Sequence, residues 1–301
     1  GMTVALYDYM SQILIELVKF ANLVVSISRA LASAKRVQAA LDTDSETENE
    51  KRHETSDSYI EFRNVGVKYT DGSVGVKNIN FKANKGDTIG IIGGTGSGKS
   101  TIVNLLPRLY DASEGTVFLD GKDVKSYSLK ELRKKIGIAL QRPAVFKGTI
   151  RSNVSPLGDL SDENINAGIE KAQAADVVKA KENGIDSVLE QNGRNLSGGQ
   201  RQRISVARAL AKRPEVLILD DSSSALDYIT DLKLRRAIKN SDYPVTTFIV
   251  SQRASSVAGA DKIIVMDEGE IVGIGTADEL RKTCSVFRET EASQMSGEAK
   301  K

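Results

Sequence analysis

The stretch 88-TIGIIGGTGSGKS-100 decides the fold that this 301-residue chain is expected to adopt. Its first five residues, Thr88–Ile92, are mostly apolar and predict a short buried β-strand. Four glycines follow between residues 93 and 98, and a helix is expected over Ser100–Leu109. Glycines let the backbone approach a ligand closely, so that backbone N–H groups and the positive end of the helix converge on one anion. The stretch therefore predicts a strand, a phosphate-binding loop and a helix.

The spacing in the loop is that of the Walker A motif: Gly93, four further residues, and then Gly98-Lys99-Ser100. In this motif the lysine reaches the β- and γ-phosphates of a nucleotide, and the serine hydroxyl binds Mg²⁺. We therefore expect Lys99 to take part in catalysis and Ser100 to be a metal ligand. The residues expected to bind nucleotide are Gly93, Gly94, Thr95, Gly96, Ser97, Gly98, Lys99, Ser100 and Thr101.

A second element of the same site is expected further along the chain. Val216–Leu219 is a continuous apolar run, which is typical of a buried parallel strand, and Asp220-Asp221 follows it directly. Because ligands bind at the carboxyl edge of such sheets, Asp220 is expected to hold Mg²⁺, directly or through water. The predicted ligands of the chain are thus ATP and Mg²⁺.

Residues 195–203, NLSGGQRQR, separate this chain from other nucleotide-binding proteins. They resemble the signature sequence of the ATP-binding cassette (ABC) family and, as in that family, precede the strand that ends in Asp220. A serine and two glycines that open a helix form a second amide-lined anion site. The resemblance implies that this site faces the ATP held by a partner domain. The signature residues are Leu196, Ser197, Gly198, Gly199 and Gln200.

Other positions match the family in their order along the chain. The resemblance implies that Tyr69 stacks on adenine and that Gln141 contacts Mg²⁺ and senses the transmembrane part. It also implies that the loop Ser224, Ala225, Leu226 and Asp227 crosses the dimer interface.

Residues 149–154, TIRSNV, and the long N-terminal segment resemble ABC exporters in particular. Ser28–Leu41 resembles the cytosolic end of a sixth transmembrane helix, so the chain is expected to be a C-terminal fragment or truncated product of a half-transporter. The resemblance implies a plasma membrane location with the ATP-binding domain on the cytosolic face. It does not indicate the transported substrate.

Two departures from the family pattern bear on hydrolysis. Efficient ATPases of the family carry Glu directly after the strand aspartate and His in a later loop, whereas this chain has Asp221 and Gln252. Asp221 is one methylene shorter than Glu, so its carboxylate lies more than about 1 Å from where the attacking water would be held, and a misplacement of that size can cost about 10²-fold in rate. Gln252 can hydrogen-bond a phosphate but cannot carry a proton's charge. We expect a degenerate site that binds ATP and hydrolyses it slowly, in a chain whose intact signature serves the catalytic site of a homologous partner in a heterodimer.

The segment before the cassette contains no glycine or proline from Met2 to Val65 and predicts a helix over about Thr3–Leu41. Two interpretations stay open: a membrane helix that continues into the cytosol, or a soluble amphipathic helix. Glu16 and Lys19 interrupt the apolar part but can pair on one helix face. The expected organisation is a transmembrane end at 1–41, a charged linker at 42–57, the nucleotide-binding domain at 58–290 and a disordered tail at 291–301.

Strands alternating with helices predict an α/β fold with a mostly parallel core sheet. The resemblance adds an antiparallel β-subdomain and a helical subdomain that carries the signature, on a P-loop NTPase core. The expected strands besides Thr88–Ile92 and Val216–Leu219 are Tyr59–Val67, Val76–Ala83, Thr116–Leu119, Thr247–Val250 and Lys262–Met266, and the further helices are Leu129–Lys135 and Ile204–Ala211.

Composition excludes several other functions. The formal net charge is only +2, which gives no electrostatic footprint for nucleic acid. Cys284 is the one cysteine and His53 the one histidine, so neither a disulfide nor a histidine-based catalytic site is expected. The alternative to an exporter subunit is a non-hydrolysing module that uses ATP only to dimerise. A soluble ABC ATPase of DNA repair or translation would need long coiled coils or a second cassette.

Overall fold

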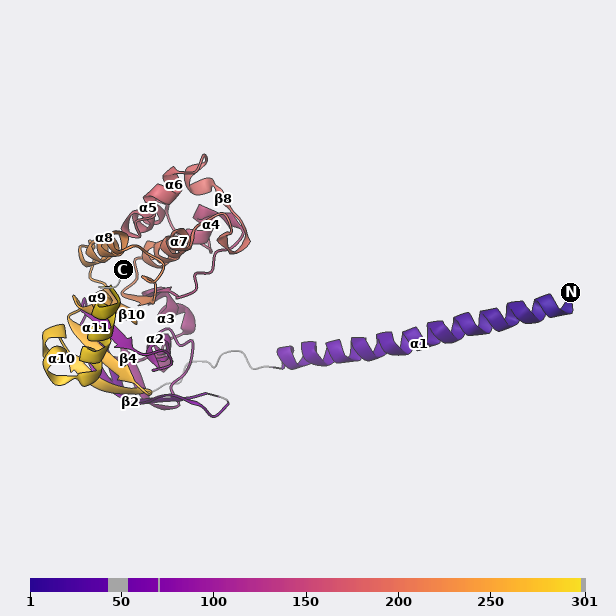
Figure 1. Cartoon of the computed structure of the whole chain (residues 1–301), viewed down its shortest axis with the longest axis horizontal. Coiled ribbons are helices and arrows are strands. Elements are labelled where there is room, and N and C mark those ends of the chain that lie inside the picture. The colour runs from indigo at the N-terminus through magenta and orange to yellow at the C-terminus, as the bar shows by residue number, and fades with distance from the viewer. Residues whose placement is uncertain (43–53, 70, 299–301) are drawn as a thin grey trace. The chain divides into compact units, whose positions relative to one another are not determined.

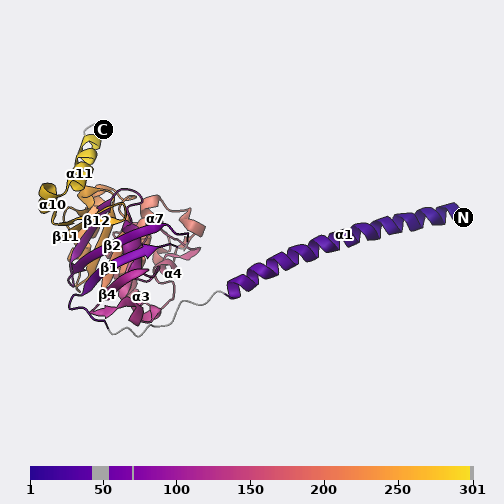
Figure 2. The same cartoon turned by 90° about the horizontal axis from the view of Figure 1, so that it is seen from below.

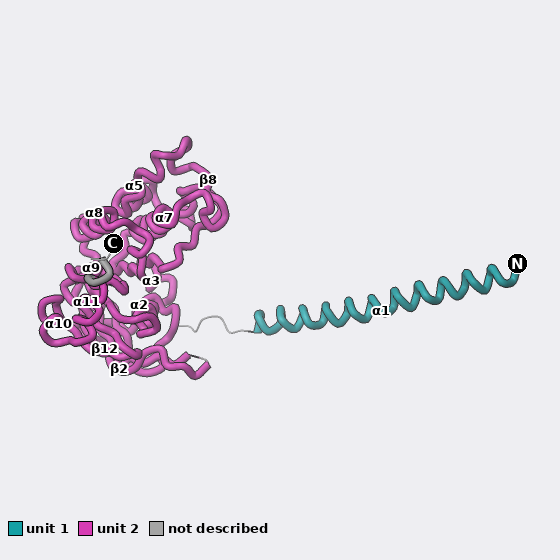
Figure 3. Tube along the Cα trace, viewed as in Figure 1, with its two compact units in different colours: residues 1–48 teal, residues 49–301 magenta. Residues whose placement is uncertain are grey.

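The computed structural model describes residues 1–42, 54–69 and 71–298, which fall into two compact units, 1–48 and 49–301 (Figure 3). The described part of the first unit is one helix, α1 (Met2–Leu41), which contains the predicted helix. By length and composition α1 can cross a membrane, and Lys19 donates a hydrogen bond to Glu16 at 2.7 Å, as its spacing predicts. Most of the predicted linker, residues 43–53, lies outside the described residues.

The second unit begins with an antiparallel sheet in the order β2-β1-β4-β5. Its buried face is apolar, and the rings of Phe62 and Phe81 stack at 4.4 Å between centroids. Ahead of the sheet, Thr55 pairs with Lys122, so the end of the predicted linker is part of this unit. The strands are β1 (Ile60–Lys68), β2 (Val74–Ala83), β4 (Glu114–Leu119) and β5 (Lys122–Asp123).

A six-stranded sheet in the order β12-β11-β3-β10-β9-β6 forms the centre of the unit. All neighbouring strands are parallel except β11 and β12, in agreement with the predicted parallel core. Apolar side chains alternate between two buried clusters, with Ile91 in one and Ile92 in the other, because successive residues of a strand face opposite sides. The strands are β3 (Thr88–Gly93), β6 (Ile136–Ala139), β9 (Val216–Asp220), β10 (Thr246–Ser251), β11 (Lys262–Asp267) and β12 (Glu270–Gly275).

Helices cover this sheet and also form a lobe of their own. Figure 1 shows α4, α5, α6 and β8 together at one end of the unit, with β2 at the other end. The helices are α2 (Lys99–Leu105), α3 (Leu129–Lys135), α4 (Ile150–Val154), α5 (Asp162–Lys171), α6 (Ala175–Lys179), α7 (Gly198–Ala211), α8 (Tyr228–Lys239), α9 (Ala254–Val257), α10 (Ala277–Thr283) and α11 (Ser285–Glu298). The short elements are β7 (Gly148–Thr149), β8 (Val188–Leu189) and 3₁₀ turns at Val124–Ser126, Gly184–Asp186 and Gln191–Gly193.

Two predicted elements need correction. The helix expected over Ser100–Leu109 ends at Leu105, because Pro107 has no N–H to continue it and Arg108 takes a left-handed φ of 51°. The tail expected to be disordered from residue 291 is instead helical as far as Glu298, where α11 ends. Gln294 in this part of α11 donates a hydrogen bond to the carbonyl oxygen of Gln252. Figure 2 shows α11 extending from the body of the unit toward the C-terminus. Residues 299–301 lie outside the described part of the chain.

Candidate nucleotide-binding site

The loop between β3 and α2 depends on its glycines. Gly96 and Gly98 have φ angles of 80° and 92°, a left-handed conformation that favours glycine. A Cβ on Gly93 would lie 2.2 Å from the carbonyl oxygen of Met266 in the neighbouring strand β11. The loop therefore follows the path that the glycine spacing predicts, from the carboxyl end of β3 into the first turn of α2.

The ammonium group of Lys99 lies inside this loop. Its Nζ atom donates hydrogen bonds to the carbonyl oxygens of Gly93, at 2.9 Å, and Gly94, and to Ser97 Oγ at 3.4 Å. Only 8% of the residue is exposed. Burial lowers the pKa of Lys99, and the charges of Asp220 and Asp221 oppose that shift. The loop thus holds a buried cation beside two carboxylates.

Ser100 and Asp220 meet at the carboxyl edge of the sheet. Ser100 Oγ donates to Asp220 Oδ1 at 3.0 Å, and burial raises the pKa of this carboxyl although the hydrogen bond opposes it. Within the described residues no three His, Cys, Asp or Glu side chains gather as a metal site. Mg²⁺ takes oxygen ligands and is often bound through one or two carboxylates plus phosphates and water. The hydroxyl and carboxylate oxygens present therefore fit Mg²⁺ that is bound together with a nucleotide.

A cavity of about 150 Å³ brings together the residues predicted to act in catalysis and those predicted to hold the metal. Lys99, Ser100, Gln141, Asp220, Asp221 and Gln252 all line it, with Thr95, Gly96, Val250 and Ser251.

Asp220, the last residue of β9, and Asp221, which follows it, are held in different ways. Gln141 Nε2 donates to Asp221 Oδ2 at 3.0 Å, a contact that sequence analysis did not predict. Asp221 has a left-handed φ of 45°, and its backbone N–H donates to Val250 O at 2.9 Å in the neighbouring strand β10. The Asp221 carboxylate is thus directed to Gln141, whereas Asp220 accepts from Ser100.

A neighbouring cavity of about 300 Å³ shares the walls of the loop and lies beside Tyr69. The Tyr69 hydroxyl and Thr101 Oγ1 form a hydrogen bond of 2.7 Å, and the Tyr69 ring meets Tyr110 edge-on at 5.7 Å. Gly75 also lines this cavity, although no sequence motif marks it. A Cβ at that position would lie 2.8 Å from the Tyr69 ring, so the glycine makes room for the ring. Gly96, Lys99 and Ser100 line both cavities, and together they form one extended site.

The signature residues lie outside both cavities. Ser197 caps the N-terminus of α7, its hydroxyl accepting from the Gln200 N–H while the Gln200 side chain accepts from the Ser197 N–H. Leu196 is buried, and a Cβ on Gly199 would lie 2.8 Å from the Ala225 carbonyl oxygen. The predicted interface loop therefore packs against the start of α7. Its last residue, Asp227, caps α8.

One further contact joins the signature helix to the site. Gln202 is buried in α7 and donates from Nε2 to Leu140 O at 3.2 Å, next to Gln141. No sequence signal singles out this glutamine, because a polar residue within a helix is most often exposed. The contact connects the start of α7 with the segment that carries Gln141.

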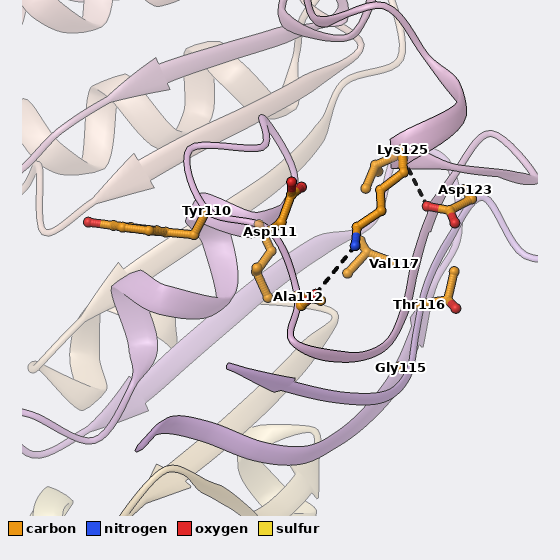
Figure 4. Close-up of a pocket in the computed structure, with 10 residues that line it drawn as sticks. Tyr110, Asp111, Ala112, Gly115, Thr116, Val117, Asp123 and Lys125 are labelled. Carbon is orange, nitrogen blue, oxygen red and sulfur yellow. Dashed lines mark hydrogen bonds between the residues drawn. The ribbon is translucent and has the colours of Figure 1, made fainter. Parts of the chain in front are cut away.

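A separate cavity near α2 and β4 is too small for a nucleotide. It holds about 10 Å³ and is lined in part by Tyr110, Asp111, Ala112, Asp123 and Lys125. Figure 4 shows the Lys125 side chain directed to the carbonyl group of Ala112, and its Nζ atom lies 3.4 Å from that oxygen. The Tyr110 ring points away from both residues.

The sequence profile of the family described as ABC transporter matches residues 76–224, which include the phosphate loop, the signature and the strand that ends in Asp220. The chain carries an ABC transporter ATP-binding domain. This ABC domain contains the predicted P-loop fold, and the match confirms the predicted family and ATPase class.

Individual relatives of the ABC domain agree with the profile. The chain is 38% identical over 305 residues to an uncharacterised ABC transporter ATP-binding protein, YfiB, of Bacillus subtilis (strain 168), an alignment that covers 99% of this chain and 52% of that protein. It is 41% identical over 224 residues to an ATP-dependent lipid A-core flippase of Hahella chejuensis (strain KCTC 2396), covering 73% of this chain and 38% of the flippase.

A solved structure of a bacterial Atm1-family ABC exporter with ATP bound superposes with a TM-score of 0.80 at 29% identity, covering 89% of this chain and 48% of that one. The chain thus spans about half the length, or less, of the relatives it matches.

Proposed function

We propose that the chain is the ATP-binding part of an ABC exporter and that Mg²⁺-ATP binds in the two adjoining cavities. One observation carries the proposal: the buried Lys99 ammonium and the Ser100–Asp220 pair share a cavity with Gln141, Asp221 and Gln252. The adenine stacks on Tyr69, and the phosphates accept hydrogen bonds from the amides of the loop and from Lys99. In this arrangement Lys99 exchanges its contacts with the Gly93 and Gly94 carbonyls for phosphate oxygens.

Mg²⁺, when bound, would supply positive charge to neutralise the phosphates during hydrolysis. Ser100, Asp220 and Gln141 are the residues that would hold it. Gln141 is hydrogen-bonded to Asp221 in this structure, so binding to the metal requires that contact to open.

The site of this chain is proposed to hydrolyse ATP slowly. Asp221 stands where the attacking water needs a base, but its carboxylate is one methylene short of that of Glu and accepts a hydrogen bond from Gln141. A base that is lost or displaced costs about 10²- to 10⁴-fold in rate. Gln252 lines the same cavity and can donate to a γ-phosphate oxygen, but it cannot act as an imidazolium does.

The signature residues of this chain are proposed to contact the ATP that is bound by a partner chain. Leu196–Gln200 lie outside the chain's own cavities, and Ser197 opens α7 with backbone N–H groups that can receive an anion. A homologous half-transporter with Glu and His at the two altered positions would supply the hydrolytic site, which makes a heterodimer the preferred assembly. In this proposal α1 belongs to the transmembrane part, and the ABC domain lies on the cytosolic face of the plasma membrane.

ATPase measurements on the full chain in detergent test the proposal. We expect the wild-type chain to bind ATP with little turnover, and the double change Asp221→Glu with Gln252→His to raise turnover at least tenfold. Mixing the wild-type chain with a homologous chain that carries Glu and His should also raise turnover, and Ser197→Ala in this chain should abolish that gain. Turnover of tens per second by the wild-type chain alone would contradict the degenerate site.

A non-hydrolysing module that uses ATP only for dimerisation is the second candidate. The observation in its favour is the pair of altered residues, Asp221 and Gln252, in one cavity. The mixed dimer separates the two functions. ATP-dependent association without any gain in turnover supports the module, whereas turnover that depends on Ser197 supports the exporter subunit.

A further inference from the structure

The side chain of Gln294, near the end of α11, contacts the backbone of the segment that carries Gln252. Its Nε2 atom donates to the carbonyl oxygen of Gln252 at 2.7 Å, and its Oε1 atom accepts from the N–H of Ala254 at 2.8 Å. One amide group therefore holds a donor and an acceptor two residues apart. Forty residues or more separate these partners in sequence, so the contact is tertiary.

These hydrogen bonds satisfy backbone groups of the segment after β10. Ser251 ends the strand and α9 begins at Ala254, so the backbone groups between them belong to no ladder and no helix. The first N–H groups of a helix have no partner within the helix. A side chain at the N-cap position usually accepts a hydrogen bond from one of them. Arg253 occupies that position in α9 and makes no such contact. Gln294, from a different helix, accepts instead from the N–H of Ala254, the first residue of α9.

Helix α11 is anchored well enough to fix the Gln294 side chain. Phe287 is fully buried in the core and lies two turns before Gln294, on the same helix face. Arg281 in α10 donates to both carboxylate oxygens of Glu291, at 2.8 and 3.0 Å. The amide of Gln294 therefore projects from a helix held on two sides, next to a segment that lines the nucleotide cavity.

We propose that Gln294 is a positioning residue that holds the backbone of Gln252 so that its side chain meets the γ-phosphate. The inference rests on the proposed function, because it assigns Gln252 to the terminal phosphate of ATP. Gln294 lines neither of the two cavities and acts through the carbonyl of Gln252 and the start of α9. ADP has no γ-phosphate, so the contact matters for ATP and not for ADP.

Equilibrium binding of Mg²⁺-ATP and Mg²⁺-ADP to the full chain in detergent provides the test. Gln294→Ala should weaken ATP binding about three- to tenfold, which is the effect of losing the one hydrogen bond between Gln252 and the γ-phosphate at ordinary net strength. It should change ADP binding less than twofold. Gln294→Glu keeps the acceptor for Ala254 and loses the donor to Gln252, so it should weaken ATP binding in the same way. Glu289→Ala, at an exposed position of the same helix, should behave like the wild type.

A role confined to stability gives a different result. It would lower the unfolding midpoint and leave the ratio of ATP to ADP affinity unchanged in both Gln294 variants, which overturns the inference. If Gln294→Ala does not fold, Gln294→Glu decides alone. In a Gln252→Ala background, Gln294→Ala should have no further effect on the ratio, and an additive effect would contradict action through Gln252.

Failure of the inference can be told apart from failure of the proposed function. If the wild-type chain binds neither nucleotide, the proposed function is wrong. If the wild type binds both and Gln252→Ala weakens ATP selectively while the Gln294 variants do not, only the role of Gln294 is wrong.

Discussion

Alanine substitutions at three glycines of the phosphate loop should differ sharply in their effect on stability. At Gly93 an added Cβ would lie 2.2 Å from the Met266 carbonyl oxygen and 2.7 Å from Ser97 Oγ. Real Cβ atoms essentially never approach within 3.0 Å of such atoms. The two strands must therefore separate by at least 0.8 Å, the difference between 3.0 and 2.2 Å, at a position where Met266 and Gly93 are paired.

The expected costs follow from these distances and from the backbone angles. Overpacking typically destabilises a fold by about 1–3 kcal/mol, and because the clash at Gly93 is with backbone we place Gly93→Ala at the upper end, about 2–3 kcal/mol. Gly96 has open space around it but a φ of 80°, so Gly96→Ala should cost about 1–2 kcal/mol through strain alone. Gly94 has nothing within 4 Å of its ideal Cβ and no positive φ, so Gly94→Ala should stay within about 0.5 kcal/mol of the wild type.

Urea unfolding of the full chain, followed through its tyrosines because it has no tryptophan, measures these differences. The slope of the transition should stay the same among the variants, so that the midpoints report stability. The reasoning would be refuted if Gly93→Ala were as stable as Gly94→Ala.

Two further changes test the site and the fold around it. Gly75→Val should push the Tyr69 ring aside and weaken ATP binding at least fivefold in an equilibrium titration. The reason is that stacking of an aromatic ring on a base contributes about 1–3 kcal/mol. Unchanged affinity would contradict the role of the ring. Burial acts to raise the pKa of the Glu215 carboxyl, but hydrogen bonds from Lys135 and Tyr59 hold it below its ordinary value of 4.5. A lowered carboxyl pKa stabilises the fold above the unfolded pKa, and this stabilisation is lost as pH falls through the folded value. Glu215→Gln should therefore destabilise the chain by about 1–3 kcal/mol at pH 7, and urea titrations below pH 4.5 should show the difference from the wild type shrinking.

Sequence predicted the elements whose chemistry demands particular residues at fixed spacing. The strand at Thr88, the glycine loop and Lys99 were recognisable because few other arrangements of residues form an amide-lined phosphate site. Asp220 was placed at the correct edge of the sheet because a four-residue apolar run must be a buried strand or part of a buried helix, and its short length favoured the strand.

Elements defined by tertiary contacts were not predictable in this way. The strand β6 is only four residues long and follows α3 without a turn signal, so its pattern gave no indication of a core strand. The helix α11 has a polar composition that resembles a tail, and its order comes from Phe287, the ion pair with Arg281 and the contacts of Gln294. Hydrogen bonds donated by an amide side chain, such as that from Gln141 to the Asp221 carboxylate, leave no periodic or compositional signal in one sequence.

Nucleotide affinity of the Lys99→Ala variant tests the central claim most directly. Lys130→Ala, at an exposed position of α3, is the matched control for loss of one positive charge. Because Lys99 is buried in the loop beside both carboxylates, its removal should weaken Mg²⁺-ATP binding by more than tenfold, as truncating one member of a buried charge pair typically does, while the control binds as the wild type does. Equal affinity of Lys99→Ala and the wild type for ATP would contradict the assignment of this loop as the phosphate site.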